Sequence, residues 1–191
     1  MRVFPLTAVL IAALAIAACR PARLPMKPYA YPAWGFKASF QTPPVTKDEP
    51  ASPDGSTPHN FLAEAHTHDD DFVVTACECS QSPGDIDGLA DYLGAHFAQG
   101  VGGKVVSKTY VATFENLFGR EIQISKDGKP FATLRVFTVG GRSYQVIAVS
   151  NYGPSDRAVV RFLYSFHALD AHGEVTNSIA PAAPASNATP G

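Results

Sequence analysis

The feature of this sequence that most restricts its fold is a series of β-branched and aromatic segments divided by glycine turns. Four segments have the composition of strands: VVSKTYVATF (105–114), LFGREIQIS (117–125), FATLRVFTV (131–139) and SYQVIAVSN (143–151). Asp127-Gly128 and Gly140-Gly141 separate the last three. Glycine readily adopts the positive φ of tight hairpin turns. The pattern therefore predicts an antiparallel sheet.

Two other segments have the apolar periodicity of helices. Residues 82–103 combine an acidic first turn and terminal glycines with apolar side chains at Ile86, Leu89, Leu93, Phe97 and Val101. Residues 156–169 follow a possible cap at Ser155 or Asp156 and share one apolar face. We expect further strands at 35–40, 60–68 and 72–80. Together these segments predict an α+β fold in which helices pack on an antiparallel sheet.

Several short motifs resemble PsbP-like domains, the family of the extrinsic photosystem II subunit and its bacterial relatives. The matching residues are GFKASFQTPP from Gly35, Gly119-Arg120-Glu121, Arg135-x-Phe137, Tyr144 and Phe162-Leu163-x-Ser165-Phe166. The resemblance implies an α/β/α sandwich. It also implies an assembly, docking or binding module and no enzyme activity, because PsbP-like proteins are not known as enzymes.

Glu121 and Arg135 test whether these motifs are structural. A three-residue loop at 127–129 places Glu121 opposite Arg135 and puts Ile122, Ile124, Ala132, Leu134 and Val136 on one face. A two-residue loop instead places Arg120 opposite Arg135, which is a like-charge pair. Because the apolar face fixes register, we expect the first arrangement, with Glu121 and Arg135 as a structural ion pair.

The N-terminus predicts an exported and lipidated protein. Residues 1–18 carry one early arginine and a short apolar run, as in a secretory signal peptide. Ile16-Ala17-Ala18-Cys19 resembles the lipobox of bacterial lipoproteins, in which acyl chains such as palmitate anchor the cysteine. We expect Cys19 and a proline-rich tether over 19–34, a domain over 35–169 and a disordered tail over 170–191. The protein would be anchored to a bacterial membrane, facing the periplasm or the exterior.

The stretch EAHTHDDDFVVTACECS (64–80) concentrates histidines, aspartates and cysteines. A two-residue turn at Asp69-Asp70 pairs His68 with Asp71 and puts His66, His68, Asp71, Cys77 and Cys79 on one face. The opposite face then has the composition of a core face: Phe61, Ala63, Ala65, Phe72, Val74 and Ala76. A three-residue turn instead separates the histidines from the cysteines. Even with the two-residue turn, His66 and the cysteines are roughly 13 Å apart, which is too far for one metal ion to bind both. A smaller site of His66, His68 and Asp71 suits zinc, copper or nickel, although solvated polar residues near a turn give the same pattern.

Cys77 and Cys79 leave two alternatives open. Residues two apart in a strand have Cα atoms about 6.6 to 7 Å apart, at the upper end of disulfide geometry. Reduced thiols packed as small apolar groups are the simpler interpretation, and a strained redox pair is the other. The pair lacks the CxxC spacing of thiol oxidoreductases.

Composition restricts the partners. A net charge of −2 gives no basic surface for nucleic acid, and no motif calls for a cofactor. We therefore predict a non-catalytic binding or assembly module with a protein partner and a membrane anchor. A periplasmic metal-binding protein that uses the His66/His68 hairpin is the alternative.

Overall fold

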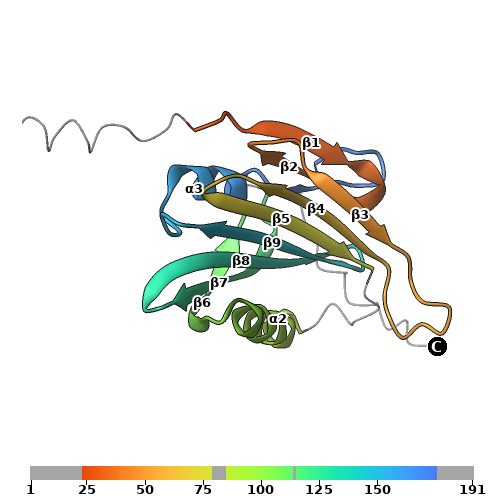
Figure 1. Cartoon of the computed structure of the whole chain (residues 1–191). Helices are drawn as coiled ribbons and strands as arrows, with labels where there is room; N and C mark the ends of the chain where they lie inside the picture. The colour runs from red at the N-terminus through yellow and green to blue at the C-terminus, as the bar shows by residue number, and fades with distance from the viewer. Residues whose placement is uncertain (1–22, 79–84, 114, 176–191) are drawn as a thin grey trace, which may run out of the picture.

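A computed structural model describes residues 23–78, 85–113 and 115–175, which form two antiparallel sheets and two α-helices (Figure 1). The larger sheet has the strand order β3-β4-β5-β9-β8-β7-β6, and the smaller one has the order β1-β2-β10. The strands are β1 (Lys27–Tyr31), β2 (Phe36–Phe40), β3 (Val45–Glu49), β4 (Asn60–His66), β5 (Asp70–Cys77), β6 (Lys104–Ala112), β7 (Phe118–Lys126), β8 (Lys129–Val139), β9 (Arg142–Ser150) and β10 (His167–Ala168). The helices are α2 (Ile86–Val101) and α3 (Arg157–Tyr164), with a 3-10 turn, η1 (Pro32–Trp34), after β1.

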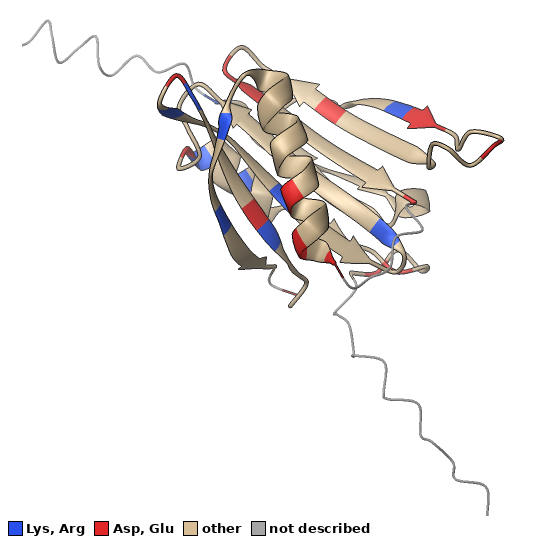
Figure 2. Ribbon diagram, turned by 90° about the horizontal axis from the view of Figure 1, so that it is seen from below, with Lys and Arg blue, Asp and Glu red and all other residues tan. Residues whose placement is uncertain are grey.

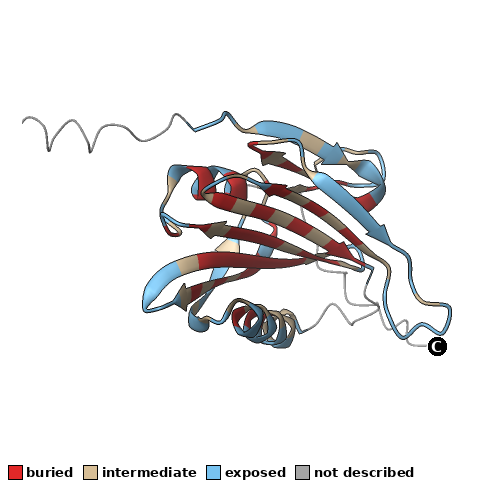
Figure 3. Cartoon of the chain, viewed as in Figure 1, coloured by how far each residue is buried: buried red, intermediate tan, exposed pale blue. Residues whose placement is uncertain are grey.

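The molecule has three layers, because the larger sheet is covered on both faces. Helix α2 packs on one face over β6, β7 and β8, while α3 and the smaller sheet pack on the other face (Figure 1). Each face has its own apolar core, and the buried positions concentrate on the central strands β5, β9 and β8 (Figure 3). The expectation of an antiparallel sheet with helices packed on it is confirmed.

Helix α2 forms where predicted, but it approaches the sheet through small residues. The Asp85 side chain accepts a hydrogen bond from Gly88 N at 2.7 Å, and Gly102 ends the helix at φ 69°. The buried positions are Ala90, Gly94 and Ala98, and the predicted stripe of larger apolar residues is half-buried on either side of them. Small residues allow the helix backbone to lie close to β7.

Charges on the α2 face are paired across elements. Figure 2 shows this face with acidic and basic positions interspersed. Both carboxylate oxygens of Asp87 accept hydrogen bonds from Arg120 at 2.6 and 2.7 Å, and Lys108 contacts Asp91 at 2.6 Å. The arginine of the Gly119-Arg120-Glu121 motif therefore fixes α2 to the sheet.

The β7–β8 hairpin confirms the predicted pairing but not the predicted loop. Glu121 stands opposite Arg135, as expected. The turn itself has two residues, Asp127 and Gly128, both at positive φ. A bulge between Ile124 and Ser125 shifts the register by one residue and restores the buried apolar face.

The β4–β5 hairpin has its predicted core face and a shifted turn. Phe61, Ala63, Ala65, Phe72, Val74 and Ala76 are all buried, as predicted. Thr67 N donates to Asp70 O at 2.8 Å, so His68 and Asp69 form the turn, one residue earlier than expected. The Thr67 hydroxyl accepts hydrogen bonds from the backbone N–H groups of both aspartates and fixes this position.

Described secondary structure lies on both sides of the predicted domain of 35–169. β1 and η1 lie within the range 19–34 predicted as a tether, and β1 pairs with β2 along its whole length. Leu169 forms a bridge with Val175 inside the predicted tail. Among the described residues, no helix is long and apolar enough to cross a membrane.

Candidate functional site

The histidine-rich hairpin brings together only part of its predicted metal site. His66 Nδ1 lies 2.8 Å from Asp71 Oδ1, and its Nε2 lies 3.5 Å from Glu64 Oε2. The hydrogen bond to Asp71 raises the pKa of His66. His68 is exposed in the turn, and no group of three histidine, cysteine, aspartate or glutamate side chains in the described ranges is placed to hold a metal. The set of His66, His68 and Asp71 is therefore not assembled.

The cysteine predictions have different outcomes. Cys77, at the end of β5, is disulfide-bonded, so the interpretation of this residue as a reduced thiol is wrong. The other cysteines, Cys19 and Cys79, lie outside the described residues. A redox role for Cys77 and Cys79, and lipidation of Cys19, remain predictions.

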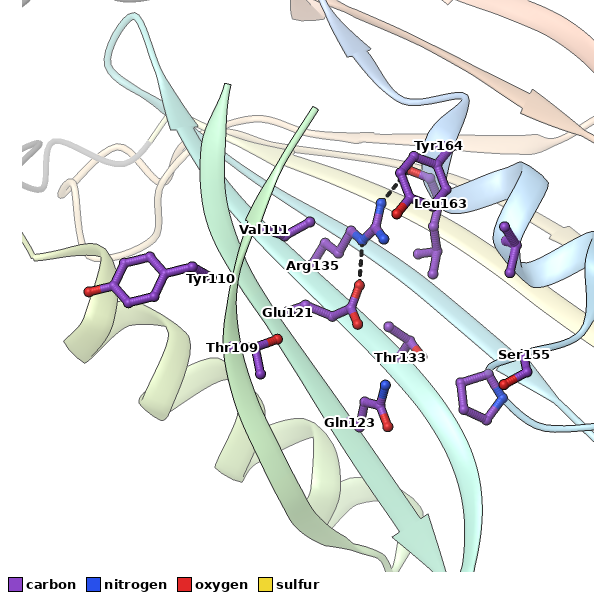
Figure 4. A pocket seen from close by; sticks show the side chains of 12 residues that line it. Thr109, Tyr110, Val111, Glu121, Gln123, Thr133, Arg135, Ser155, Leu163 and Tyr164 are labelled. Atoms are coloured by element: carbon purple, nitrogen blue, oxygen red, sulfur yellow. Dashed lines mark hydrogen bonds and ion pairs between the residues drawn. The ribbon is translucent and has the colours of Figure 1, made fainter. Parts of the chain in front are cut away.

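The structure contains a polar groove that the sequence did not predict. We call it the α3 groove; its volume is about 410 Å³, and it lies between α3 and the uncovered part of strands β6, β7 and β8 (Figure 4). Its lining comprises Thr109, Tyr110, Val111, Glu121, Gln123, Thr133, Arg135, Pro154, Ser155, Val160, Leu163 and Tyr164. The groove exists because α3 covers β9 and stops short of the sheet edge.

Glu121 and Arg135 form the charged floor of the α3 groove. Arg135 Nε donates to Glu121 Oε2 at 2.8 Å, and its Nη1 donates to the carbonyl oxygen of Leu163 at 3.1 Å (Figure 4). The guanidinium also lies 4.5 Å from the centre of the Tyr164 ring. Because Leu163 is in the last turn of α3, Arg135 joins the helix to the sheet as well as neutralising Glu121.

Thr133 is the polar floor residue with unused hydrogen-bonding capacity. It lies between β7 and β9 in the sheet, paired with Gln123 and Ala148. The residue is 1% exposed, and its hydroxyl oxygen has no hydrogen-bond partner among the described residues. A buried hydroxyl without a partner costs about 1 to 3 kcal/mol. Thr75 on β5 has a similar unpartnered hydroxyl but does not line the groove. Thr133 is therefore the groove residue at which a ligand would supply a missing bond, once its buried hydroxyl rotates toward the groove.

The chemistry of the α3 groove suits binding of neutral polar groups. Among the described residues, its lining includes no histidine, cysteine or lysine and a single carboxylate, Glu121, which is paired with Arg135. The remaining polar side chains are hydroxyls and one amide, which recognise amide and hydroxyl groups. A ligand in this groove would therefore be held by hydrogen bonds, with little net charge.

A second cavity, of about 630 Å³, is larger, but the polar side chains that line it already have partners. It lies near the β8–β9 turn, where Arg142 Nη2 donates to Glu78 at 2.7 Å. The Tyr144 hydroxyl donates to the carbonyl oxygens of Trp34 and Gly35, and burial raises its pKa. These bonds give Tyr144, one of the residues that resemble PsbP-like domains, a structural role. Because the side chains of the second cavity are already paired, the α3 groove is the better candidate site.

Sequence comparison does not place the chain in a family: no family model and no curated protein matches it. Among solved structures, cyanobacterial PsbP (CyanoP) from Synechocystis sp. PCC 6803 is similar, with 12% identity and a TM-score of 0.48 over 79% of this chain and 97% of that one. A structure from Bacteroides thetaiotaomicron has 11% identity and a TM-score of 0.34, over 76% of this chain and 49% of its own. Membership of the PsbP-like family stays a prediction.

Proposed function

We propose that this protein is a membrane-tethered, non-catalytic binding module that holds a polar segment of a protein partner in the α3 groove. The observation that carries the proposal is the unpartnered hydroxyl of Thr133 at the groove floor, beside the neutralised Glu121–Arg135 pair. A peptide backbone offers alternating amide donors and acceptors, which match the hydroxyl and amide groups of the lining. The neutral floor disfavours a strongly charged ligand, because neither charge is free to pair with it.

The tether is proposed from the N-terminal sequence and from the first described contacts of the chain. Cys19 follows a lipobox-like motif, and Arg23 stands four residues later. Arg23 Nη1 contacts Asp70 Oδ2 and Asp156 Oδ1, each at 2.7 Å. Acyl chains on Cys19 would therefore hold the domain close to the bilayer, because the fixed point on the domain is only a few residues away.

The binding function is tested by photo-crosslinking in native membranes. A photoreactive amino acid replaces Thr109, an exposed threonine that lines the groove on edge strand β6, or replaces Thr46, an exposed threonine on the opposite edge strand β3. We expect one discrete protein adduct from position 109 and none from position 46. Equal adducts from both positions, or no adduct from position 109 at native abundance, would contradict a partner in the groove.

The anchor is tested separately by metabolic labelling with palmitate. The wild-type chain should carry the label, and Cys19→Ser should lose it and leave the membrane fraction, while Cys79→Ser should keep it. Equal labelling of wild type and Cys19→Ser would show that the anchor is wrong and would leave the crosslinking result unaffected.

A further inference from the structure

The outer face of α3 is unusual for a helix that only covers a core. Its buried residues are Ala158, Val159, Phe162 and Leu163. Arg157, Val160, Arg161 and Tyr164 are exposed on the opposite face, with 39% exposure for Val160 and 45% for Tyr164. The exposed face therefore combines two cations, an apolar side chain and an aromatic ring, which is the composition of helices that lie on membrane surfaces.

Neither arginine of this face is explained by the stability of the domain. Arg157 and Arg161 make no ion pair with another described residue. Arg157 is the first residue of α3, where the helix dipole disfavours a cation. Arg161 lies in the last turn of α3, where the helix dipole favours a cation, but it has no carboxylate partner among the described residues. An anionic surface outside the molecule would pair with both guanidinium groups.

The N-terminal segment meets the domain at the same corner. Arg23 contacts Asp156, which caps α3 by accepting a hydrogen bond from Ala158 N at 2.8 Å. Arg23 also lies over the ring of Tyr152, 4.9 Å from its centre. Tyr152 and Leu24, which follows Arg23, are exposed by 44% and 56%. Figure 1 shows this end of the chain entering beside the beginning of β5 and α3.

The acidic groups at this corner do not cancel the exposed cations. The side chains of Asp70 and Asp156 are 2% and 9% exposed, and Arg23 contacts both of them. Burial raises the pKa of Asp70. Asp69, which is partly exposed in the β4–β5 turn, is a further carboxylate close to Asp70. The outward-facing charge next to the tether therefore comprises two arginines, Arg157 and Arg161, against one carboxylate.

We infer that the outer face of α3, together with Leu24 and Tyr152, lies against anionic lipid headgroups when the chain is tethered. The inference rests on the proposed lipid anchor, since four residues from Cys19 to Arg23 span at most about 14 Å and keep this corner at the bilayer. Tyr164 and Val160 also line the α3 groove. The groove then opens at the membrane surface, and the segment it binds belongs to a protein at that surface.

The test uses the predicted mature chain without Cys19, residues 20–191, which includes every described residue. A histidine tag in place of Cys19 tethers it to vesicles that contain a nickel-chelating lipid. An environment-sensitive fluorescent amino acid replaces Val160 or, as a matched control, Val45, an exposed valine on edge strand β3. On phosphatidylglycerol-rich vesicles we expect a blue shift of emission at position 160, no shift at position 45, and no shift at either position on phosphatidylcholine vesicles.

Charge variants complete the test. Arg157→Gln/Arg161→Gln should abolish the shift at position 160 and weaken partitioning of the untethered chain roughly 30-fold, about fivefold for each arginine. Lys37→Gln/Lys47→Gln removes the same charge from β2 and β3 and should weaken partitioning less than about twofold. No shift at position 160 on anionic vesicles, equal shifts at 160 and 45, or equal effects of the two double variants would overturn the inference. Because the tag replaces the lipid, these outcomes do not depend on acylation of Cys19 or on crosslinking from the groove.

Discussion

Replacing Arg135 with methionine should be among the most destabilising single changes on the groove side of the sheet. The side chain is 5% exposed and donates charge-assisted hydrogen bonds to Glu121 and to the Leu163 carbonyl. Such bonds contribute about 1.5 to 3 kcal/mol each. Removing the cation also leaves Glu121, which is 19% exposed, without its partner. We therefore expect a loss of about 3 to 5 kcal/mol, from a total of about 5 to 15 kcal/mol for a domain of this size.

Urea unfolding of a double-mutant cycle measures the interaction itself. Glu121→Gln leaves a buried guanidinium without its anion and should cost about 2 to 3 kcal/mol. Glu121→Gln/Arg135→Met removes both charges, so its cost should fall short of the sum of the single costs by at least about 1 kcal/mol. Lys47→Met, at an exposed ion pair on β3, should hardly move the midpoint. Single costs that add within about 0.5 kcal/mol would refute a coupled, buried pair.

Three further changes test other parts of the structure by the same urea titration. A Cβ on Gly119 would lie 2.4 Å from a backbone carbonyl oxygen, so Gly119→Ala should cost about 3 kcal/mol, whereas Gly100→Ala, with no atom within 4 Å, should stabilise α2 by up to about 1 kcal/mol; equal effects would contradict the packing. Because the hydrogen bond to Asp71 raises the pKa of His66 above its ordinary 6.5, its stabilisation is complete below that pH and is lost as the pH rises through the raised value. His66→Gln should therefore cost more at about pH 6 than at about pH 8, and a cost independent of pH would be the contrary result. Thr133→Val removes a buried hydroxyl without a partner and should raise stability by about 1 kcal/mol; a marked loss would show that the hydroxyl is satisfied within the fold.

Most strands of the larger sheet and both helices were predictable because their signals are local, whereas β3, β10 and the end of α3 at Tyr164 were not predicted. Alternation of apolar and polar residues identified the core face of β4 and β5. The two-residue turn lies one position earlier than the one considered, and this displacement leaves the same residues on the buried face. The Glu121–Arg135 pairing was also correct, although the loop was not. The apolar pattern identifies the face that must be buried. The two-residue turn alone would place Arg120 opposite Arg135, and the bulge between Ile124 and Ser125 shifts the register so that Glu121 is opposite Arg135.

The first strand and the metal set were mispredicted for physical reasons. β1 contains Pro28 and begins in a proline-rich segment, which favoured a tether. Proline is tolerated on an edge strand, and β1 is the edge of its sheet. The two-residue turn considered at Asp69-Asp70 would place His68 opposite Asp71, but hydrogen bonds of the Thr67 hydroxyl place the turn one residue earlier.

The α3 groove could not be predicted because it results from long-range packing. Its wall and floor come from segments that are separated in sequence, as in the bond from Arg135 to Leu163, 28 residues away. Glu121 and Arg135 were recognised as a pair, yet their position beneath a groove depends on where α3 ends. Thr133 had no distinguishing signal in a strand rich in β-branched residues.

The most direct test of the central claim measures the crosslink yield from position 109 in native membranes. It compares the protein with Thr133 in the groove floor and the Thr133→Val variant. If the hydroxyl of Thr133 binds the partner segment, loss of one hydrogen bond should lower the yield roughly two- to tenfold, while the purified variant stays folded. An unchanged yield from a folded Thr133→Val protein would contradict binding of the partner at the groove floor.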